Sequence, residues 1–424
     1  MSNDQLLSKP ALDIEGAFAR LKSVVNHTPL QFNANLSRKY QCRVYLKRED
    51  LQIVRSYKLR GAYNMMSQLT PDQLSKGVVC ASAGNHAQGF AYSCKKLNVK
   101  GVVFMPIPSP QQKVTQTKMF GENFVEVKLV GDTFDDTAKA AKEYTASHGM
   151  TFIPPFDHAS IIEGQATVGV EILADYNALE KTPIDYMFIP VGGGGLSAGV
   201  GAYFKQHSPS TQIVGLEPEG APSMLTALKE GHPVELDHID KFVDGAAVKR
   251  IGDVTFSICK DVIDDMHLVS EGKICSTILQ MYNEEAIVVE PAGAMSIAVL
   301  DDYAEQIKGK TIVCIVSGSN NDIDRMQEIK ERSLIYEGLK HYFLIRFAQR
   351  PGALKDFVNK VLGPDDDITR FEYIQKHNKE AGPALVGLEL KSKKDYQVLI
   401  ENMKQFQINY TEINKDDNIY GYLV

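Results

Sequence analysis

From about residue 75 to residue 320, short runs of β-forming residues alternate with amphipathic helical segments. The strand-like runs are nearly continuous in apolar residues, as in strands that helices cover on both faces of a sheet. They lie at residues 100–107, 124–130, 184–191, 211–216 and 310–317, and residues 132–147 show a helical pattern between them. This alternation predicts an α/β fold with largely parallel strands, whose ligands bind at the carboxyl ends of the strands.

A different pattern begins after Asn321. Residues 322–339 form a charged helical stretch, and we expect a domain boundary there. The order that follows is strand (HYFLIRFA), helix (351–362), strand (ITRFEYIQ), strand (PALVGLEL), helix (393–406) and strand (410–414). This βαββαβ order predicts an α+β, ferredoxin-like domain of about 85 residues at residues 340–424.

The composition is that of an ordinary globular protein, and it excludes several classes of function. The 424 residues carry 46 basic and 53 acidic side chains, and the net charge of −7 argues against an extended nucleic-acid-binding surface. No apolar run approaches the roughly 20 residues of a membrane-spanning helix. No secretory signal is visible at the N-terminus, so we expect a cytoplasmic protein. The six cysteines are scattered, and we expect them to be reduced and buried.

Four consecutive glycines at residues 192–195 join an expected strand (IDYMFIPV) to an expected helix (LSAGVGAYF). Glycines allow a tight turn and let backbone N–H groups approach an anion at the positive end of a helix, which predicts a phosphate site. The residues alone do not say which molecule carries the phosphate. Gly193, Gly195 and Ala198 fit the dinucleotide-binding pattern G-x-G-x-x-A, with Glu217 about 20 residues further on.

The same loop also fits the nucleophile elbow of serine hydrolases, G-x-S-x-G, with Ser197 as the nucleophile. A glycine turn that serves only helix–strand packing is a weak explanation for four glycines in succession. Other parts of the chain must therefore decide between these interpretations.

Two further strings do so. Residues 55–62 read RSYKLRGA and place Lys58 just before a helical pattern, and residues 81–87 read ASAGNHA after the apolar run GVVC. Near the end of the alternating region, SGSN begins at Ser317 and closes the strand TIVCIV. Lys58, Asn85, the four glycines and Ser317, in this order, resemble the fold-type II (tryptophan-synthase-β-like) pyridoxal-phosphate enzymes. More narrowly, the strings are similar to those of biosynthetic threonine dehydratases, also called threonine deaminases, of the short form.

The resemblance spans roughly residues 20–335, and the C-terminal part matches separately. It implies a two-lobed catalytic domain at residues 1–335 with parallel sheets, in which a smaller lobe, roughly residues 55–155, is inserted in the larger. It also implies that residues 340–424 form a single ACT-like regulatory domain.

Within the resemblance, each string has an implied role. Lys58 would hold pyridoxal 5′-phosphate as a Schiff base and abstract the Cα proton of the substrate. Asn85 would hydrogen-bond the 3′-oxygen of the cofactor, and Ser317 would face its pyridine nitrogen. The phosphate would be bound by the backbone of Gly192, Gly193, Gly194, Gly195 and Leu196. The substrate carboxylate would be bound by Ser82, Ala83, Gly84 and Asn85.

The implied reaction is that of an L-threonine ammonia-lyase, which converts L-threonine to 2-oxobutanoate and ammonia in the first step of isoleucine biosynthesis. L-Serine would be a slower substrate, since one methyl group changes transition-state binding by only about 1–3 kcal/mol. Serine racemases carry a second serine where Ala83 stands, so racemisation is disfavoured. Some relatives bind a cation near the position of Glu217, but Ser223 stands here in place of a further carboxylate, so we predict no divalent metal site. A monovalent cation near Glu217 and a Glu217 that only caps its strand both stay open.

Three other classes of function stay open at this point. An NAD(P)-dependent oxidoreductase would use the glycine loop, a serine hydrolase would use Ser197, and a non-catalytic amino-acid sensor would use only the C-terminal part. A serine dehydratase or racemase is the alternative within the family.

The string FAQRPGALKDFVNKVL at residues 347–362 resembles the strand–turn–helix of ACT-like regulatory domains, and ITRFEY matches the following strand. Exposed N–H groups near Gly352 would receive an amino acid's carboxylate or a neighbouring chain. The family implies feedback inhibition by isoleucine, with valine as an opposing effector, in a homotetramer. A purely structural oligomerisation module is the alternative, because a βαββαβ unit alone carries no function.

Overall fold

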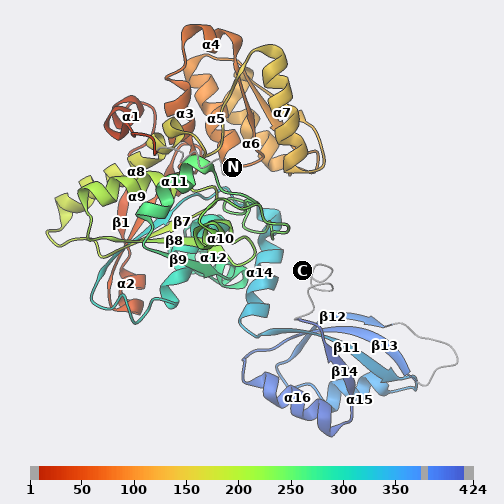
Figure 1. The fold of residues 1–424 in the computed structure, drawn as a ribbon. Coiled ribbons are helices and arrows are strands. Elements are labelled where there is room, and N and C mark those ends of the chain that lie inside the picture. Colours follow the sequence, from red (N-terminus) through yellow and green to blue (C-terminus); the bar gives the residue numbers. More distant parts are fainter. Residues whose placement is uncertain (1–8, 374–380, 415–424) are drawn as a thin grey trace, which may run out of the picture. The chain divides into compact units, whose positions relative to one another are not determined.

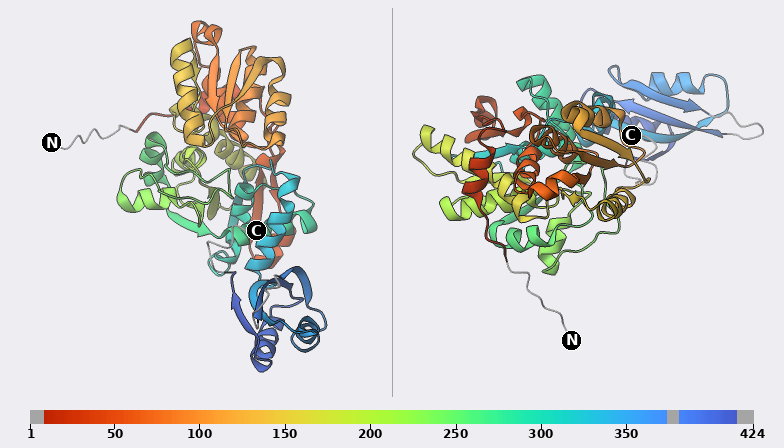
Figure 2. Two further views of the ribbon diagram at one scale, coloured as in Figure 1. Left: turned by 90° about the vertical axis from the view of Figure 1, so that its right-hand side faces the viewer. Right: turned by 90° about the horizontal axis from the view of Figure 1, so that it is seen from above.

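The structure, a computed structural model, describes residues 9–373 and 381–414 (Figure 1, Figure 2). The chain divides into two compact units. The larger unit contains the chain up to Glu271 together with Glu284–Asp322, and the smaller one contains Gly272–Asn283 and the chain from Ile323 onward. The assignment of residues 1–335 and 340–424 to functional domains stays a prediction, because compactness alone gives neither part a function.

A six-stranded sheet forms the centre of the larger unit, and all its strands except β1 run parallel to their neighbours. In spatial order the strands are β1 (Leu30–Phe32), β2 (Arg43–Arg48), β10 (Thr311–Val316), β7 (Tyr186–Pro190), β8 (Gln212–Pro218) and β9 (Asp265–Val269). Helices α8 (Ala159–Leu179) and α9 (Gly195–His207) pack on one face, where Ile172 and Phe204 belong to the same core cluster as Ile189 and Val313 of the sheet. The predicted α/β architecture with parallel strands is confirmed.

A second, four-stranded sheet is formed by the chain between β2 and β7, and all its strands are parallel. The strands, in spatial order, are β5 (Val125–Leu129), β4 (Gly101–Met105), β3 (Val78–Ala81) and β6 (Thr151–Phe152). The helices around it are α3 (Lys58–Met66), α4 (Pro71–Lys76), α5 (Asn85–Leu97), α6 (Gln111–Gly121) and α7 (Phe134–His148). Phe90 of α5 packs with Val103 on one face, and Ala141 of α7 packs with Phe104 on the other.

The other helices between residues 14 and 298 have the following bounds. They are α1 (Ile14–Leu21), α2 (Ala34–Tyr40), α10 (Ser223–Glu230), α11 (Asp253–Val262), α12 (Glu271–Glu285) and α13 (Pro291–Ala298), with 3-10 turns at Glu49–Leu51, Glu122–Phe124, Val299–Asp301 and Ile323–Arg325. Among the described residues, no helix is both long and apolar enough to cross a membrane.

The smaller unit contains a four-stranded antiparallel sheet of βαββαβ connectivity, as predicted. Its elements are β11 (Lys340–Ala348), α15 (Ala353–Lys360), β12 (Asp367–Tyr373), β13 (Ala381–Glu389), α16 (Asp395–Gln405) and β14 (Asn409–Glu412). The sheet order is β12-β13-β11-β14. Phe343, Val386 and Leu388 of the sheet pack against Phe357 of α15 and Leu399 of α16. Helix α14 (Met326–Tyr336) precedes β11. The last ten residues of the predicted ACT-like domain lie outside the described residues.

Four charged side chains are buried together where β2, the first 3-10 turn, α3 and α8 meet. Lys47, Glu49, Arg60 and Glu171 are at most 2% exposed. Arg60 contacts Glu49 at 2.8 Å and Glu171 at 2.7 Å, and the Nζ of Lys47 lies 2.6 Å from Glu171. The two positive and two negative charges balance, so no buried charge is left alone. Because Arg60 lies two residues after Lys58, this ion cluster fixes the start of α3.

We predict that Arg60→Gln lowers the free energy of unfolding by about 3–5 kcal/mol, because it leaves two buried carboxylates with one cation. The loss is measured from urea unfolding curves. The control is Lys76→Gln, which breaks an exposed ion pair with Asp72 on α4 and costs less than about 1 kcal/mol. Equal effects of the two substitutions would contradict the role of the cluster.

Candidate active site

Several loops converge where the carboxyl ends of β3, β7 and β10 meet the start of α3. Ser56 forms an isolated antiparallel bridge with Gly318, directly after β10. The N–H of Tyr57 donates to the carbonyl oxygen of Ser317 at 3.3 Å, and the N–H of Ser319 donates to that of Arg55 at 3.0 Å. The string around Lys58 and the loop that contains Ser317 are therefore joined backbone to backbone.

Lys58 is the first residue of α3, and it is only partly exposed. Its Nζ donates a hydrogen bond to the carbonyl oxygen of Pro155 at 3.0 Å. Burial disfavours the ammonium form and lowers the pKa of Lys58 to about 8, although the charge of Glu290 opposes the shift. A large share of the amine is thus neutral at mildly alkaline pH, the form that acts as a nucleophile or base.

The glycine loop lies close to Lys58. Phe156, which packs against this loop, directly follows Pro155, the hydrogen-bond partner of Lys58. A Cβ atom on Gly193 would lie 2.3 Å from the ring of Phe156, so only glycine fits there. Gly194 adopts a left-handed conformation (φ 90°) and precedes the first residue of α9, and no side chain caps this helix. N–H groups at the positive end of α9 are therefore available to an anion.

The two other interpretations of the glycine loop find no support in the contacts of their residues. The buried hydroxyl of Ser197 donates to the carbonyl oxygen of Gly194 at 3.1 Å, and its other neighbour is the thiol of Cys259 rather than a histidine. Glu217, at the end of β8, accepts the N–H groups of Met224 (2.6 Å) and Leu225 (2.9 Å) at the start of α10. Glu217 is fully buried, and burial raises its pKa to about 7.

Asn85 begins α5, and its side-chain amide is held at both ends. The Nδ2 of Asn85 donates to a carboxylate oxygen of Glu290 at 2.7 Å, and the Oδ1 of Asn85 accepts from the Nδ2 of Asn320 at 2.7 Å. The backbone N–H of Asn320 donates to the other oxygen of Glu290 at 3.2 Å. These three residues fix which end of the Asn85 amide carries the donor.

Sequence reasoning missed Glu290 and Asn320. Glu290 is 5% exposed, and a Cβ atom on Gly318 would lie 2.6 Å from its carboxylate. Burial raises the pKa of Glu290 to about 7, and the charge of Asp244 raises it further against the opposing effects of Asn85, Lys113 and the N–H of Asn320. One signal in the sequence could have pointed to Glu290. It is the only carboxylate in the apolar stretch AIVVEPAGAM, and an apolar stretch of this kind indicates a buried segment rather than a surface loop.

The loop at residues 82–84 lies at the end of β3 and leads into α5. The N–H of Gly84 donates to the hydroxyl of Ser82 at 3.2 Å, and Ala83 packs at the border of the core of the smaller sheet. A Cβ atom on Gly84 would meet no atom within 4 Å, so the loop borders open space. His86 is buried, its Nε2 lies 2.9 Å from the carbonyl oxygen of Ile153, and burial lowers its pKa to about 3. His86 is thus a neutral, packed histidine.

The structure therefore brings together all the predicted site residues. Pro155 and Phe156 connect Lys58 to the glycine loop, Glu290 connects Asn85 to Gly318, and the bridge at Ser56 connects Lys58 to Ser317. The roles assigned to the individual residues stay predictions.

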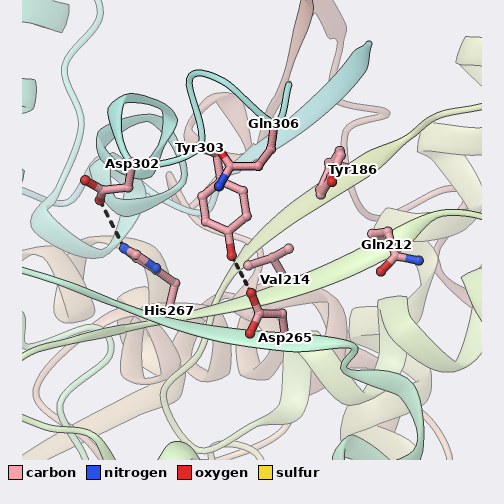
Figure 3. A pocket seen from close by; sticks show the side chains of 8 residues that line it. All are labelled: Tyr186, Gln212, Val214, Asp265, His267, Asp302, Tyr303 and Gln306. Carbon is pink, nitrogen blue, oxygen red and sulfur yellow. Dashed lines mark hydrogen bonds and ion pairs between the residues drawn. The ribbon is translucent and has the colours of Figure 1, made fainter. Parts of the chain in front are cut away.

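A separate pocket lies at the opposite, amino ends of the strands of the larger sheet (Figure 3). Its lining residues are Tyr186, Gln212, Val214, Asp265, His267, Asp302, Tyr303 and Gln306. His267 pairs with Asp302 at 3.0 Å, and the hydroxyl of Tyr303 donates to Asp265 at 2.6 Å. Because its carboxylates are already paired and parallel sheets bind ligands at the other edge, this pocket is not the candidate active site.

Comparisons with known proteins agree with this geometry. Residues 21–318 match the family described as pyridoxal-phosphate dependent enzyme, and residues 331–423 match the C-terminal regulatory domain of threonine dehydratase. The chain is 57% identical to the biosynthetic L-threonine dehydratase of Halalkalibacterium halodurans (97% of this chain, 98% of the relative) and 56% identical to that of Bacillus subtilis (96% of each). Processed threonine deaminase isoform 2 of Solanum lycopersicum has a similar structure, with a TM-score of 0.71 and 42% identity over 76% of this chain and 92% of that one.

We predict that the buried carboxyl of Glu290 makes the protein less stable as pH rises from 4.5 to about 7. Its pKa is raised from 4.5 to about 7, so between these values the folded state holds a proton that the unfolded state has lost. Relative to Glu290→Gln, the wild-type chain should lose about 3 kcal/mol of unfolding free energy across this window.

The measurement is urea unfolding between pH 4 and 8, on protein freed of small molecules. Glu143→Gln, on the exposed side of α7, is the matched control and should parallel the wild type. A constant difference between wild type and Glu290→Gln at every pH would contradict the raised pKa.

Proposed function

The chain belongs to the threonine dehydratase family of pyridoxal-phosphate-dependent enzymes, and from this premise we propose that it converts L-threonine to 2-oxobutanoate and ammonia. The elimination releases one water molecule. One water molecule is then consumed when the resulting imine is hydrolysed to 2-oxobutanoate and ammonia. This reaction supplies the first step of isoleucine biosynthesis. One observation carries the proposal. Lys58, whose pKa is lowered, lies with the glycine loop, Asn85 and Ser317 at the carboxyl ends of the parallel strands.

The residues of the site fit pyridoxal phosphate. The phosphate needs N–H donors and room beside the backbone, which the uncapped start of α9 and residues 192–196 supply. The amide of Asn85 points a donor away from Asn320, so a second Nδ2 hydrogen is available to the 3′-oxygen. Ser317, which is 2% exposed, offers a hydroxyl for the pyridine nitrogen. When bound, the cofactor would accept the electrons that remain at Cα after its proton is removed.

Lys58 carries the covalent link and the proton transfer in this proposal. Its lowered pKa leaves enough neutral amine to take up a proton at Nζ, and the carbonyl oxygen of Pro155 holds that atom in place. A serine hydroxyl at Ser317 cannot keep a pyridine nitrogen protonated as a carboxylate would. The sink is therefore weak, which favours loss of the β-hydroxyl over a long-lived carbanion.

The loop of Ser82, Ala83, Gly84 and Asn85 is proposed to bind the substrate carboxylate. It borders open space and leads into the positive end of α5. Ala83 carries no group that can exchange a proton, so the face of the substrate opposite Lys58 has no acid there and racemisation is disfavoured. L-Serine would react more slowly, because the site loses only the contacts of one methyl group.

The C-terminal part is proposed to act as an ACT-like regulatory domain at residues 340–424, following a catalytic domain at residues 1–335. Its match to the regulatory domain of threonine dehydratase supports a regulatory role. We propose feedback inhibition by isoleucine, with valine as the opposing effector. Gly352 (φ 86°) precedes α15 without a side-chain cap, which leaves N–H groups for a carboxylate. We propose a cytoplasmic homotetramer as the functional form.

Lys58→Ala is expected to lower kcat for 2-oxobutanoate formation by at least about 10³-fold, because it removes the proton acceptor and the covalent link. The purified wild-type protein should absorb near the visible edge, and this absorbance should be lost in the variant. Ser197→Ala is the matched control within the same site, and its activity should fall less than about tenfold.

Two outcomes would contradict the proposed chemistry. A colourless wild-type protein that binds a nicotinamide cofactor would favour the oxidoreductase. Activity that Ser197→Ala abolishes and Lys58→Ala preserves would favour the hydrolase.

A chain ended after Tyr336 is expected to keep threonine dehydratase activity and to lose inhibition by isoleucine. Initial rates with and without isoleucine, at threonine concentrations around KM, measure both properties. If isoleucine weakens threonine binding in the full chain, threonine must weaken isoleucine binding by the same factor. Inhibition that survives the truncation unchanged would remove the regulatory assignment.

A further inference from the structure

Glu290 lies between two segments that are proposed to contact different atoms of the cofactor. One of its carboxylate oxygens accepts from the Nδ2 of Asn85 at 2.7 Å, and the other accepts from the backbone N–H of Asn320 at 3.2 Å. The backbone N–H of Glu290 donates to the carbonyl oxygen of Gly318 at 3.1 Å, and Gly318 directly follows Ser317. Glu290 therefore joins the residue assigned to the 3′-oxygen to the loop assigned to the pyridine nitrogen.

The hydrogen bonds of Glu290 have a fixed direction. The backbone N–H of Asn320 can only donate, so the carboxylate oxygen that faces it must accept. An ionised carboxylate has only acceptors, so its second oxygen also needs a donor, and Asn85 must present its Nδ2 there. The Nδ2 of Asn320 continues the chain by donating to the Oδ1 of Asn85 at 2.7 Å. Both neighbours of the Asn85 amide thus favour the same orientation.

A neutral side chain of the same shape at position 290 would reverse this direction. Glutamine has one acceptor and one donor, and the backbone N–H of Asn320 requires the acceptor. The donor then faces Asn85, whose amide can pair with it only after turning by 180°. Asn320 can follow this turn, because its own Oδ1 is buried and has no hydrogen-bond partner in the part of the chain that the structure describes. The charge of Glu290 thus selects between two orientations of the Asn85 amide.

We propose that Glu290 is a positioning residue for the cofactor, whose carboxylate orients the amide of Asn85 so that Nδ2, rather than Oδ1, faces the 3′-oxygen of pyridoxal phosphate. The inference rests on the proposed function, from which it takes the pairing of Asn85 with the 3′-oxygen. It adds the group that decides which atom of Asn85 the cofactor meets. A donor at this place stabilises the 3′-oxygen as an anion, whereas the Oδ1 of a reversed amide would repel it.

The test measures the binding of 4-deoxypyridoxine 5′-phosphate to the full-length protein freed of cofactor. This probe has the 3′-oxygen and the phosphate but no aldehyde, so its dissociation constant reports contacts other than the covalent link to Lys58. The measurement is made at about pH 8, above the raised pKa of about 7 of Glu290. Glu290→Gln should raise the dissociation constant at least about tenfold, as expected when a hydrogen bond to a charged group is lost.

A double-mutant cycle shows whether Glu290 acts through Asn85. In the Asn85→Ala background, Glu290→Gln should change the dissociation constant less than about twofold, because the amide that it would reverse is absent. The absorbance of bound pyridoxal phosphate is the second readout. It should move to shorter wavelength in Glu290→Gln, because a 3′-oxygen that receives no hydrogen bond keeps a proton more readily.

Glu163→Gln is the matched control. Glu163 is also buried, and it also accepts from one backbone N–H and one asparagine amide, those of Asp13 (3.0 Å) and Asn64 (3.4 Å). These partners lie at the start of α1 and on α3 rather than in the network of Asn85. The control should keep the wild-type absorbance and a dissociation constant within about twofold of the wild type.

Three results would overturn the inference, and they separate it from the proposed function. Weaker binding in Asn85→Ala, together with wild-type binding and absorbance in Glu290→Gln, would refute the role of Glu290 and leave that of Asn85 standing. A tenfold loss in Glu290→Gln that persists in the Asn85→Ala background would show that Glu290 acts on the surrounding loops instead of through Asn85. Unchanged binding in Asn85→Ala would remove the proposed role of Asn85 and the inference with it.

Discussion

The candidate active site depends on one short piece of backbone pairing, the bridge between Ser56 and Gly318. It attaches the chain that enters α3 to the end of β10, and β10 lies between β2 and β7 within the large sheet. Arg55 adopts a left-handed conformation (φ 60°) next to the bridge, which costs an ordinary residue about 1 kcal/mol. Lys58 and Ser317 are thus positioned by backbone hydrogen bonds that a change of side chain does not remove, and the buried ion cluster of Arg60 holds the other side of α3.

Burial acts on the two central ionisable groups in opposite directions. It lowers the pKa of Lys58 and raises that of Glu290, because in both cases the charged form is the one that loses hydration. Both groups then change charge near neutral pH, whereas an exposed lysine and glutamate would stay charged over that whole range. In the buried ion cluster of Lys47, Glu49, Arg60 and Glu171, by contrast, each carboxylate lies within 2.8 Å of a basic side chain. Lys58 and Glu290 are less completely paired than the groups of the cluster. Their shifted pKa values suit the site to proton transfer.

The sequence predicted the site where chemistry is concentrated in short strings. The alternation of strands and helices gave the α/β fold, and the strings around Lys58, Asn85, the glycine loop and Ser317 lie at strand ends, where such a fold collects its ligands. It missed Glu290 because its partner Asn85 is 205 positions away, and no local spacing records that contact. Arg60 and Lys47 would pass for surface residues for the same reason, since their burial depends on partners from other elements. The strings around Lys58, Asn85 and Ser317 had already favoured one interpretation of the glycine loop. The structure adds the contacts of Ser197 and Glu217, which show that both side chains are engaged with other groups.

The course of the chain also limits how the proposed regulation can reach the site. The smaller unit takes up Gly272–Asn283 of α12 and the chain from Ile323 onward, so the chain passes between the units at both ends of that stretch of α12 and directly after Asp322. The last of these crossings follows the loop that contains Ser317, Gly318 and Asn320, the residues that position Lys58 and the amide of Asn85. The chain that leaves the loop of Ser317 therefore continues directly into the part that matches the regulatory domain. For the proposed regulation, this covalent connection is a direct link along the chain between α14 and the residues that hold Lys58 and Asn85.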